Sequence, residues 1–248
     1  MTAFSTTRTG GCSEGSYAGM NINPYCGDTA EHISANRALL AGELGVSEER
    51  IFLPHQVHDV KAAVIDEPFL AIPQAAQSEQ LEGVDALMTD IKDICIGVST
   101  ADCIPVILYA PLRQAAAVIH AGWRGTVQGI TGHVTDLFCR RFGISGEEVK
   151  AVIGPGISRK NFEVGQNVYD EFRDRGYPME SIAFMPHQKW HIDLPECNRL
   201  QLEERGIPAG SICDCGICTY DHFEQFFSAR RQGIASGRIY TGIILRNY

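Results

Sequence analysis

The sequence predicts an α/β fold, built as a single three-layer α/β/α domain with a mixed central sheet. Two patterns in the 248 residues support this expectation. Short runs that are apolar on both faces alternate with segments of helical periodicity, which is typical of a sheet covered by helices on both sides. No low-complexity linker, repeat or block of charge divides the chain, so we expect one domain over residues 1–248.

Four apolar runs are expected to form buried strands. They cover residues 94–100, 106–110, 115–120 and 149–154. The first run is rich in β-branched residues and ends at a polar cluster, as a strand that opens into a functional loop would. Because these runs lack strict alternation of apolar and polar residues, we expect them to be covered on both faces.

Segments with helical spacing of apolar residues alternate with these strands. They cover residues 31–44, 126–142, 164–175 and 194–205. Asp28 or Thr29 is positioned to cap the first helix, and Gly206 ends the last one as a C-terminal cap. Residues 74–80 are polar and predict a surface loop.

Composition limits the class of protein. The apolar fraction of 44% and the charged fraction of 21% fit an ordinary globular protein, and the formal net charge is −9. Without a basic run, a nucleic-acid backbone is not an expected partner, although a few placed arginines would suffice for a small anion. The N-terminus lacks the apolar core of a signal peptide, and no run of about 18 apolar residues predicts a membrane-spanning helix. We therefore expect a cytoplasmic protein with mostly reduced cysteines and no membrane partner.

Three residues at predicted strand boundaries carry metal-binding chemistry. Cys103 follows one strand, His120 ends another before a Gly-Trp-Arg-Gly turn, and His58 lies at a third apparent boundary. Functional groups in α/β proteins gather at strand ends. Two imidazoles and a thiolate would leave one coordination position open, which is typical of catalytic zinc. Asp59 or Asp102 could orient a ligating imidazole. Spacing alone leaves ligand and packing roles open.

A second group of cysteines is closer together in the sequence. Cys213, Cys215 and Cys218 look locally more like a ligand cluster, but a structural zinc needs four ligands and the nearest further candidate is His222. We therefore favour reduced, partly buried thiols, and leave a second metal open. The remaining cysteines are expected to be small buried apolar residues: Cys12, Cys26, Cys95, Cys139 and Cys197.

Several motifs spread over nearly the whole chain occur in a distinctive combination. The most specific are Thr100-Ala101-Asp102-Cys103-Ile104-Pro105-Val106 and His120-Ala121-Gly122-Trp123-Arg124-Gly125. Further matches lie in residues 7–13, 21–23, 36–37, 56–59, 153–157, 218–219, 226–231 and 237–238. Through these motifs the chain resembles the YfiH/YlmD-like family, also called polyphenol-oxidase laccase-domain proteins or multifunctional purine nucleoside phosphorylases. Cys12, Asp59 and Ala229 stand where the family usually has Val, Gly and Tyr.

The resemblance implies an activity and a cofactor. It implies Zn²⁺ held by His58, Cys103 and His120 in a single α/β/α layered domain. It also implies phosphorolysis of adenosine, inosine and S-methyl-5′-thioadenosine to a free base and a ribose 1-phosphate, with some adenosine deamination. The expected partners are therefore a purine nucleoside and phosphate; the oligomeric state is left open.

Both implied reactions need an activated oxygen nucleophile beside a purine. A zinc ion with an open position lowers the pKa of a bound water to about 7. We therefore expect Cys103, His120 and Asp102 to be catalytic, with Asp102 assisting proton transfer or merely capping its loop. Whether Cys103 is only a ligand, or also a nucleophile, stays open.

Phosphate binding calls for cations, and three arginines lie in the motif segments. Arg8, Arg37 and Arg124 are the candidates, because a planar guanidinium binds phosphate at two points. The alternative is that Arg37 and Arg124 pair with nearby carboxylates.

Three rival functions remain. A copper-dependent polyphenol oxidase (laccase) could use the same two histidines and one cysteine, although multicopper oxidases use several His-x-His pairs and this chain has none. A metal-free Cys-His hydrolase, with Cys103 as nucleophile and His120 as base, could act in peptidoglycan-precursor editing, a role that the resemblance also suggests. A non-enzymatic binding protein is the third, but three polar motifs at strand ends exceed what a binding surface needs.

Overall fold

The computed structural model describes residues 1–247 and divides their strands among three sheets. A four-stranded sheet has the order β1 (Thr2–Ser5), β13 (Ile239–Ile244), β5 (Cys95–Thr100) and β2 (Ile51–Phe52). A six-stranded sheet has the order β12 (Ile212–Asp214), β8 (Lys150–Ile153), β6 (Ile104–Ala110), β7 (Ala115–Ala121), β4 (Ala86–Thr89) and β3 (Ala62–Val64). A small sheet joins β10 (Ala183–Phe184), β11 (Trp190–Ile192) and β9 (Glu163–Val164). Both larger sheets mix parallel and antiparallel pairs.

The two larger sheets pack face to face, and this arrangement refines the expected single central sheet. Ile96 and Val98 of β5 share a buried core with Leu87 of β4 and Val118 of β7. Successive side chains of a strand point to opposite faces, so each sheet also has an outer face to cover. The expected α/β class with mixed sheets is confirmed, but the central layer is double. A run apolar on both faces does not reveal whether its cover is a helix or another sheet.

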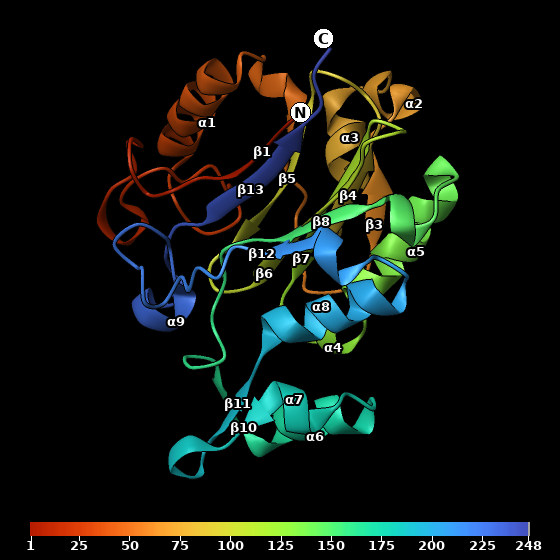
Figure 1. Cartoon of the computed structure of the whole chain (residues 1–248). Helices are drawn as coiled ribbons and strands as arrows, with labels where there is room; N and C mark the ends of the chain where they lie inside the picture. Colours follow the sequence, from red (N-terminus) through yellow and green to blue (C-terminus); the bar gives the residue numbers. More distant parts are fainter. Residues whose placement is uncertain (248) are drawn as a thin grey trace.

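Helices cover the two outer faces (Figure 1). On the four-stranded sheet lies α1 (Ala30–Leu44), whose Leu40 and Leu44 pack with Tyr240 of β13. On the six-stranded sheet lie α5 (Ile130–Phe142) and α8 (Leu194–Glu204). A separate group at the bottom of Figure 1 combines the small sheet with α6 (Gln166–Asp174) and α7 (Met179–Ile182). The remaining helices are short: α2 (Glu67–Leu70), α3 (Gln74–Gln80), α4 (Trp123–Val127) and α9 (Ala229–Gln232).

Helix boundaries follow local signals. Thr29 caps α1 by accepting from the backbone N–H of His32, and Gly45 ends it in a left-handed conformation. The helix predicted over residues 126–142 is divided into α4 and α5, because Gly129 has a φ of 84° that a continuous helix excludes. The predicted loop at residues 74–80 is wrong: it is the helix α3, which begins directly after Pro73.

Strand register places the chemistry-bearing residues at one end of the six-stranded sheet. β6 and β7 pair antiparallel, with Ile104 opposite Ala121 and Pro105 opposite His120. Cys103, directly before β6, therefore lies beside the end of β7 that carries His120. On the other side of β7, the backbone N–H of His120 donates to the carbonyl of Asp85, directly before β4 (2.8 Å). Register, rather than sequence distance, brings these residues together.

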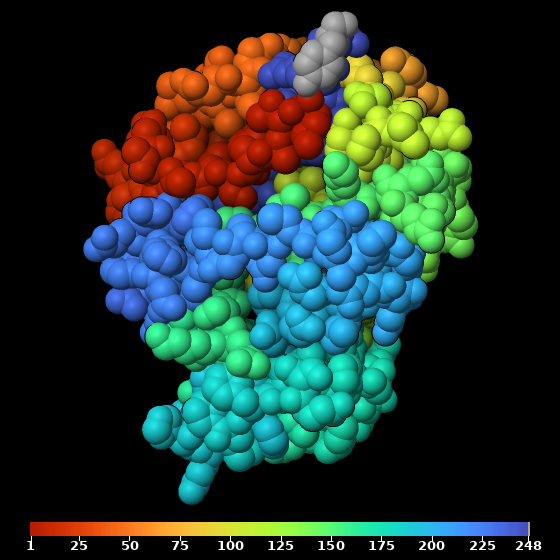
Figure 2. Space-filling model, viewed as in Figure 1, coloured from red at the N-terminus to blue at the C-terminus, as the bar shows by residue number. Residues whose placement is uncertain are grey.

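Segments from both ends of the chain lie side by side on the face shown in Figure 2, the first in red and the last in dark blue. Arg8 donates to the carbonyl of Phe223, and the backbone N–H of Arg238 donates to Asn21 Oδ1 (3.1 Å). Residues near 20 and near 238 therefore form one continuous surface. Among residues 1–247, no helix has the length and apolar character that crossing a bilayer requires.

Candidate metal centre

The side chains of His58, Cys103 and His120 converge at the end of the six-stranded sheet. Their candidate ligand atoms all lie within 4.8 Å of one another, and no other such group of three occurs in residues 1–247. The two imidazole rings meet edge to face, with centroids 4.7 Å apart and an interplanar angle of 75°. The exposure differs: His58 is exposed, Cys103 is half-buried and His120 is buried. The predicted convergence is therefore present in the structure.

Asp85, which the sequence reasoning missed, organises this group. Its carboxylate accepts four hydrogen bonds: from His120 Nδ1 (2.7 Å) and from the backbone N–H groups of Val57, His58 and Asp59. The bond to Nδ1 leaves Nε2 of His120 free to face Cys103 and His58. The signal available in the sequence was a carboxylate inside the apolar run 84–88, because burying a carboxylate is costly unless it is well paired. In the structure Asp85 is fully buried.

The backbone around the group is tightly constrained. His58 has a φ of 65° and Asp102 a φ of 85°, both in the left-handed region that ordinary residues rarely occupy. The Asp85 carboxylate offsets this cost at His58 by accepting from three successive backbone N–H groups. Gly122 is required for space, since a Cβ there would lie 2.7 Å from His58 Cδ2 and 3.1 Å from Cys103 Sγ. The chain thus positions these side chains before any ligand binds.

Electrostatic interactions among these side chains favour the ionised forms of Cys103 and His120. Burial opposes ionisation of Cys103, but the charge of His120 and hydrogen bonds with His120 and His58 outweigh it and lower the pKa of the thiol to about 6. Burial also opposes the charge on His120, yet the Cys103 thiolate and the Asp85 carboxylate raise the pKa of this imidazole to about 9. A thiolate is the form of cysteine that binds metals and attacks electrophiles.

A cavity of about 380 Å³ opens beside the group. This volume lies in the range of small-molecule sites. Its wall combines the metal-binding group with residues from the N-terminal segment, β5 and the C-terminal segment: Asn23, Tyr25, Cys26, His55, Gln56, His58, Ser99, Ala101, Cys103, His120, Ala229, Ile234 and Arg238. Arg238 is the one arginine among these lining residues, and they include no lysine. The sequence did not single it out as a phosphate ligand, although it lies in a matching motif.

The predicted phosphate-binding arginines lie elsewhere. None of Arg8, Arg37 and Arg124 is among the residues lining the cavity. Arg8 donates to the carbonyls of Ala18 and Phe223, and Arg37 donates to those of Glu48 and Ile51. Arg124 is exposed, with its guanidinium 4.4 Å from the centre of the Trp123 ring. The alternative predicted for Arg37 was an ion pair with a carboxylate, but its guanidinium donates to backbone carbonyls instead.

Asp102 links two distant segments instead of pointing at the histidines. Its carboxylate accepts from the Thr219 hydroxyl (2.7 Å) and from the backbone N–H of Arg230 (2.6 Å). Asp59 accepts from the backbone N–H of the next residue. Among the described residues, neither aspartate forms a hydrogen bond with the imidazole of His58 or His120. The carboxylate that bonds to an imidazole of this group is that of Asp85.

The other cysteines are divided between surface and interior. Cys213 and Cys215 are exposed and Cys218 is buried, and these three form no metal-binding group in the described part of the chain. Cys218 Sγ accepts from the backbone N–H of Ser158 and from Asn161 Nδ2. Of the five cysteines expected to be buried, Cys95 and Cys197 are; for the others the expectation was wrong, since Cys12 is exposed and Cys26 and Cys139 are half-buried.

Comparison with known proteins settles the family. Residues 2–246 match the model of the multi-copper polyphenol oxidoreductase laccase family. The chain belongs to this family. A solved structure with the same laccase-family fold is YlmD from Geobacillus stearothermophilus, with a TM-score of 0.91, 32% identity, and 99% of this chain and 92% of that chain covered. YfiH from Bacillus licheniformis is similar, with a TM-score of 0.91, 29% identity, and 98% and 92% covered. The resemblance to YfiH/YlmD-like proteins is confirmed.

Two curated relatives carry names that describe enzymes of purine metabolism. One is a purine nucleoside phosphorylase from Bacteroides thetaiotaomicron, 45% identical over 244 residues, which cover 98% of this chain and 90% of the relative. The other is adenosine deaminase RL5 from an unknown prokaryotic organism, 42% identical over 243 residues, which cover 97% of this chain and 92% of the relative. Both relatives therefore carry names that refer to purine chemistry rather than to copper oxidation.

Proposed function

We propose that this protein is a zinc-dependent purine nucleoside phosphorylase that acts on adenosine, inosine and S-methyl-5′-thioadenosine, with adenosine deaminase activity. The observation that carries the proposal is the convergence of His58, Cys103 and His120 on one wall of a cavity of about 380 Å³. The names of the two relatives supply the substrate class. We place both activities at this cavity.

The donor set fits a zinc ion. Ligand atoms in a tetrahedral zinc site lie about 3.3–3.8 Å apart, given bond lengths of about 2.0–2.3 Å, and the three candidate atoms here are within 4.8 Å of one another. His120 is prepared as a ligand because Asp85 holds its Nδ1. A zinc ion bound there would supply Lewis-acid chemistry at an open position.

The protein's own groups account for binding and positioning. Asp85 keeps the His120 ring in one orientation, and Gly122 leaves space for His58 and Cys103. We assign phosphate to Arg238 rather than to Arg8, Arg37 or Arg124, because Arg238 is the arginine among the described residues that line the cavity. Three backbone carbonyls of its own loop hold that guanidinium in place.

Product analysis tests the proposed function directly. Zinc-loaded protein is incubated with adenosine, with and without inorganic phosphate, and the products are separated. Adenine that forms only with phosphate supports phosphorolysis, and inosine that forms without phosphate supports deamination. If metal-replete protein forms neither adenine nor inosine, the proposal is rejected. Stoichiometric copper with strong blue absorbance in the purified protein would instead favour the oxidase.

The Asp85–His120–Cys103 sequence of contacts also supports a second candidate, a Cys-His hydrolase. An acidic residue orients the imidazole and the imidazole lies beside the thiol, which is the arrangement of a nucleophile, its base and an orienting group. Alkylation of Cys103 in metal-depleted protein discriminates the candidates. An amidase activity that survives metal removal and is abolished by alkylation would favour the hydrolase, whereas nucleoside turnover that follows zinc content favours the phosphorylase.

A further inference from the structure

A stacked aromatic pair lines the cavity. The rings of Tyr25 and His55 are stacked, with centroids 4.2 Å apart and an interplanar angle of 22°. Both residues line the cavity that His58, Cys103 and His120 also line. Tyr25 is 49% exposed, so part of its ring is accessible to a ligand.

His55 is held in a fixed orientation. Its Nδ1 is 2.5 Å from Glu82 Oε1, and its backbone forms hydrogen bonds with Leu81 and Gly83 on either side of that glutamate. Hydrogen bonds therefore hold both the backbone of His55 and one nitrogen of its ring. No hydrogen bond to the other nitrogen, Nε2, is found within residues 1–247.

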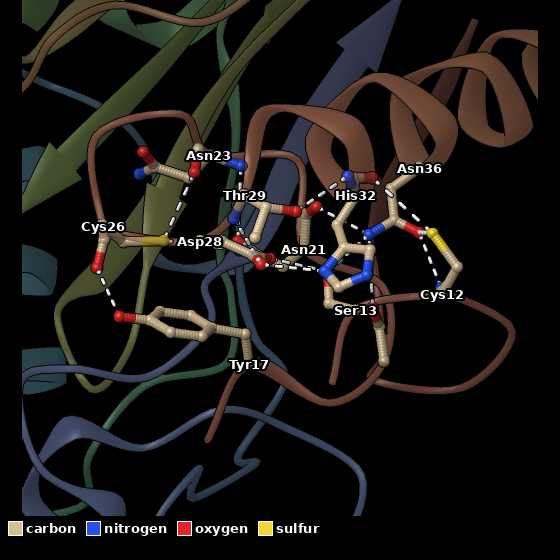
Figure 3. Close-up of polar contacts among 11 residues, drawn as sticks. Cys12, Ser13, Tyr17, Asn21, Asn23, Cys26, Asp28, Thr29, His32 and Asn36 are labelled. Carbon is tan, nitrogen blue, oxygen red and sulfur yellow. Dashed lines mark hydrogen bonds and ion pairs between the residues drawn. The ribbon is translucent and has the colours of Figure 1, made fainter. Parts of the chain in front are cut away.

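The loop from Asn21 to Asp28, which contains Tyr25 in the sequence, is braced by hydrogen bonds of its own side chains, and Figure 3 shows Asn21, Asn23 and Asp28 among them. The backbone N–H of Tyr25 donates to Asn23 Oδ1 (2.6 Å), and Asn21 Nδ2 donates to Asp28 Oδ2 (2.8 Å) across the loop. Asp28 also accepts from Ser13, which anchors the loop to the N-terminal segment. Such bracing lowers the entropy cost of presenting an exposed aromatic ring to a ligand.

We propose that Tyr25 and His55 form the base-binding wall of the cavity, on which the flat purine of the substrate stacks. The proposal rests on the proposed function for the substrate class, and adds which residues hold the base. Stacking of a nucleobase on an aromatic side chain contributes about 1–3 kcal/mol. Glu82 is a positioning residue that acts through His55.

The test compares KM and kcat for adenosine in zinc-loaded protein. Tyr25→Ala should raise KM about 5- to 150-fold, the range that this stacking energy implies, while kcat and zinc content stay near those of the wild type. Tyr25→Phe, which keeps the ring, should restore KM to within about three-fold. Glu82→Gln should raise KM less than Tyr25→Ala, because the histidine ring remains but is less firmly held.

A second stacked pair provides the matched control. The rings of Tyr169 and Trp190 are stacked with their centroids 3.8 Å apart. Both residues belong to the group formed by the small sheet, α6 and α7, and neither lines the cavity. Tyr169→Ala should leave KM unchanged, which separates a specific effect from a general loss of stability.

The outcomes separate the two proposals. In the first outcome, the wild-type protein turns over adenosine, and the Tyr25→Ala variant is folded, binds zinc and has a KM within two-fold of the wild-type value. This result would overturn the base-binding wall and leave the proposed function standing. Wild-type protein that binds adenosine in calorimetry, loses that binding in Tyr25→Ala and forms no product would overturn the proposed function and support the wall. Wild-type protein that neither binds nor converts adenosine would overturn both.

Discussion

Two groups of cysteine-containing motifs in this chain behave in opposite ways. Cys213, Cys215 and Cys218 are neighbours in the sequence, yet two are exposed, one is buried, and no metal-binding group forms among them. His58, Cys103 and His120 are far apart in the sequence, yet their ligand atoms lie within 4.8 Å of one another. The contrast shows that sequence proximity is a poor guide to a site when strand register decides which side chains meet.

The difference has a physical cause in what surrounds each group. The converging residues share a buried carboxylate, Asp85, which accepts hydrogen bonds from one ligand ring and from the backbone of the other. The clustered cysteines lie on β12 and the loop after it, at the edge of the six-stranded sheet. There only Cys218 turns inward, where it accepts from Ser158 and Asn161. The predictions below test this contrast.

The largest effect is expected from removal of the shared thiolate. Cys103→Ser should lower zinc affinity at least about 100-fold and abolish nucleoside turnover, because a hydroxyl is a much weaker zinc ligand than a thiolate. Zinc content by mass spectrometry after dialysis measures this. Cys215→Ser, in the clustered group, should leave zinc content and turnover unchanged. Zinc loss in Cys215→Ser would contradict the assignment of the metal to the first group.

The next effect concerns the carboxylate that orients the histidine. Asp85→Asn should lower zinc affinity about 10- to 100-fold, the range seen when partners of metal ligands are changed. It should also lower the free energy of unfolding by about 2–4 kcal/mol, because buried charge-assisted hydrogen bonds are lost. Zinc titration and urea denaturation measure the two effects. Asp59→Asn is the control. Among residues 1–247 its carboxylate accepts a hydrogen bond from the backbone of Val60 alone, so both quantities should stay near wild type.

A smaller effect is expected from loss of space between the ligands. Gly122→Ala would place a Cβ 2.7 Å from His58 Cδ2, so the imidazole must move. We expect zinc affinity to fall about 10-fold, in line with displacement of one ligand from its best position. Gly42→Ala, in helix α1 with nothing within 4 Å of the new Cβ, should leave zinc affinity unchanged and raise stability by about 0.5–1 kcal/mol. Equal zinc affinities in the two variants would show that the close approach at Gly122 is unimportant.

The smallest effect concerns thiol reactivity in metal-free protein. The pKa of Cys103 is about 6, whereas burial, followed by the charges of Asp214 and Cys213, raises the pKa of Cys215 above its usual value of 9.0. Thiolate is present above the pKa, so alkylation of Cys103 should reach half its maximal rate near pH 6 and alkylation of Cys215 only above pH 9. At pH 7 the rates should differ by only about five-fold, because a thiolate of lower pKa is a weaker nucleophile. Peptide mapping after iodoacetamide treatment gives both profiles, and coincident profiles would refute the difference.

The sequence was informative where one residue type and one strand boundary sufficed. Cys103 and His120 follow or end apolar runs, so their place at a sheet end could be predicted. Asp85 could not be selected in the same way, because its importance comes from the register between β4 and β7 and from three backbone N–H groups of another loop. The stacked pair of sheets was also hidden, since a residue such as Val98 looks the same under a helix as under another sheet.

The arginines illustrate the same limit for binding. Arg8 and Arg37 lie in matching motifs but do not line the cavity. Arg238 also lies in a matching motif and does line it, although its guanidinium donates to backbone carbonyls as theirs do. A motif indicates that a residue matters, and only the three-dimensional arrangement separates a structural role from a ligand-binding one.

The pairing of β1 with β13 sets the order in which this cavity can form. Ser5 and Thr241 share a hydrogen bond across 236 residues of chain, and β13 lies between β1 and β5. Arg238 and Ile234, which complete the cavity wall, precede β13 directly. The cavity wall is therefore complete only once residues 234–238 have joined segments that lie much earlier in the chain. Because contacts of long sequence separation form late and slowly, we expect His58, Cys103 and His120 to come together before this part of the wall is in place.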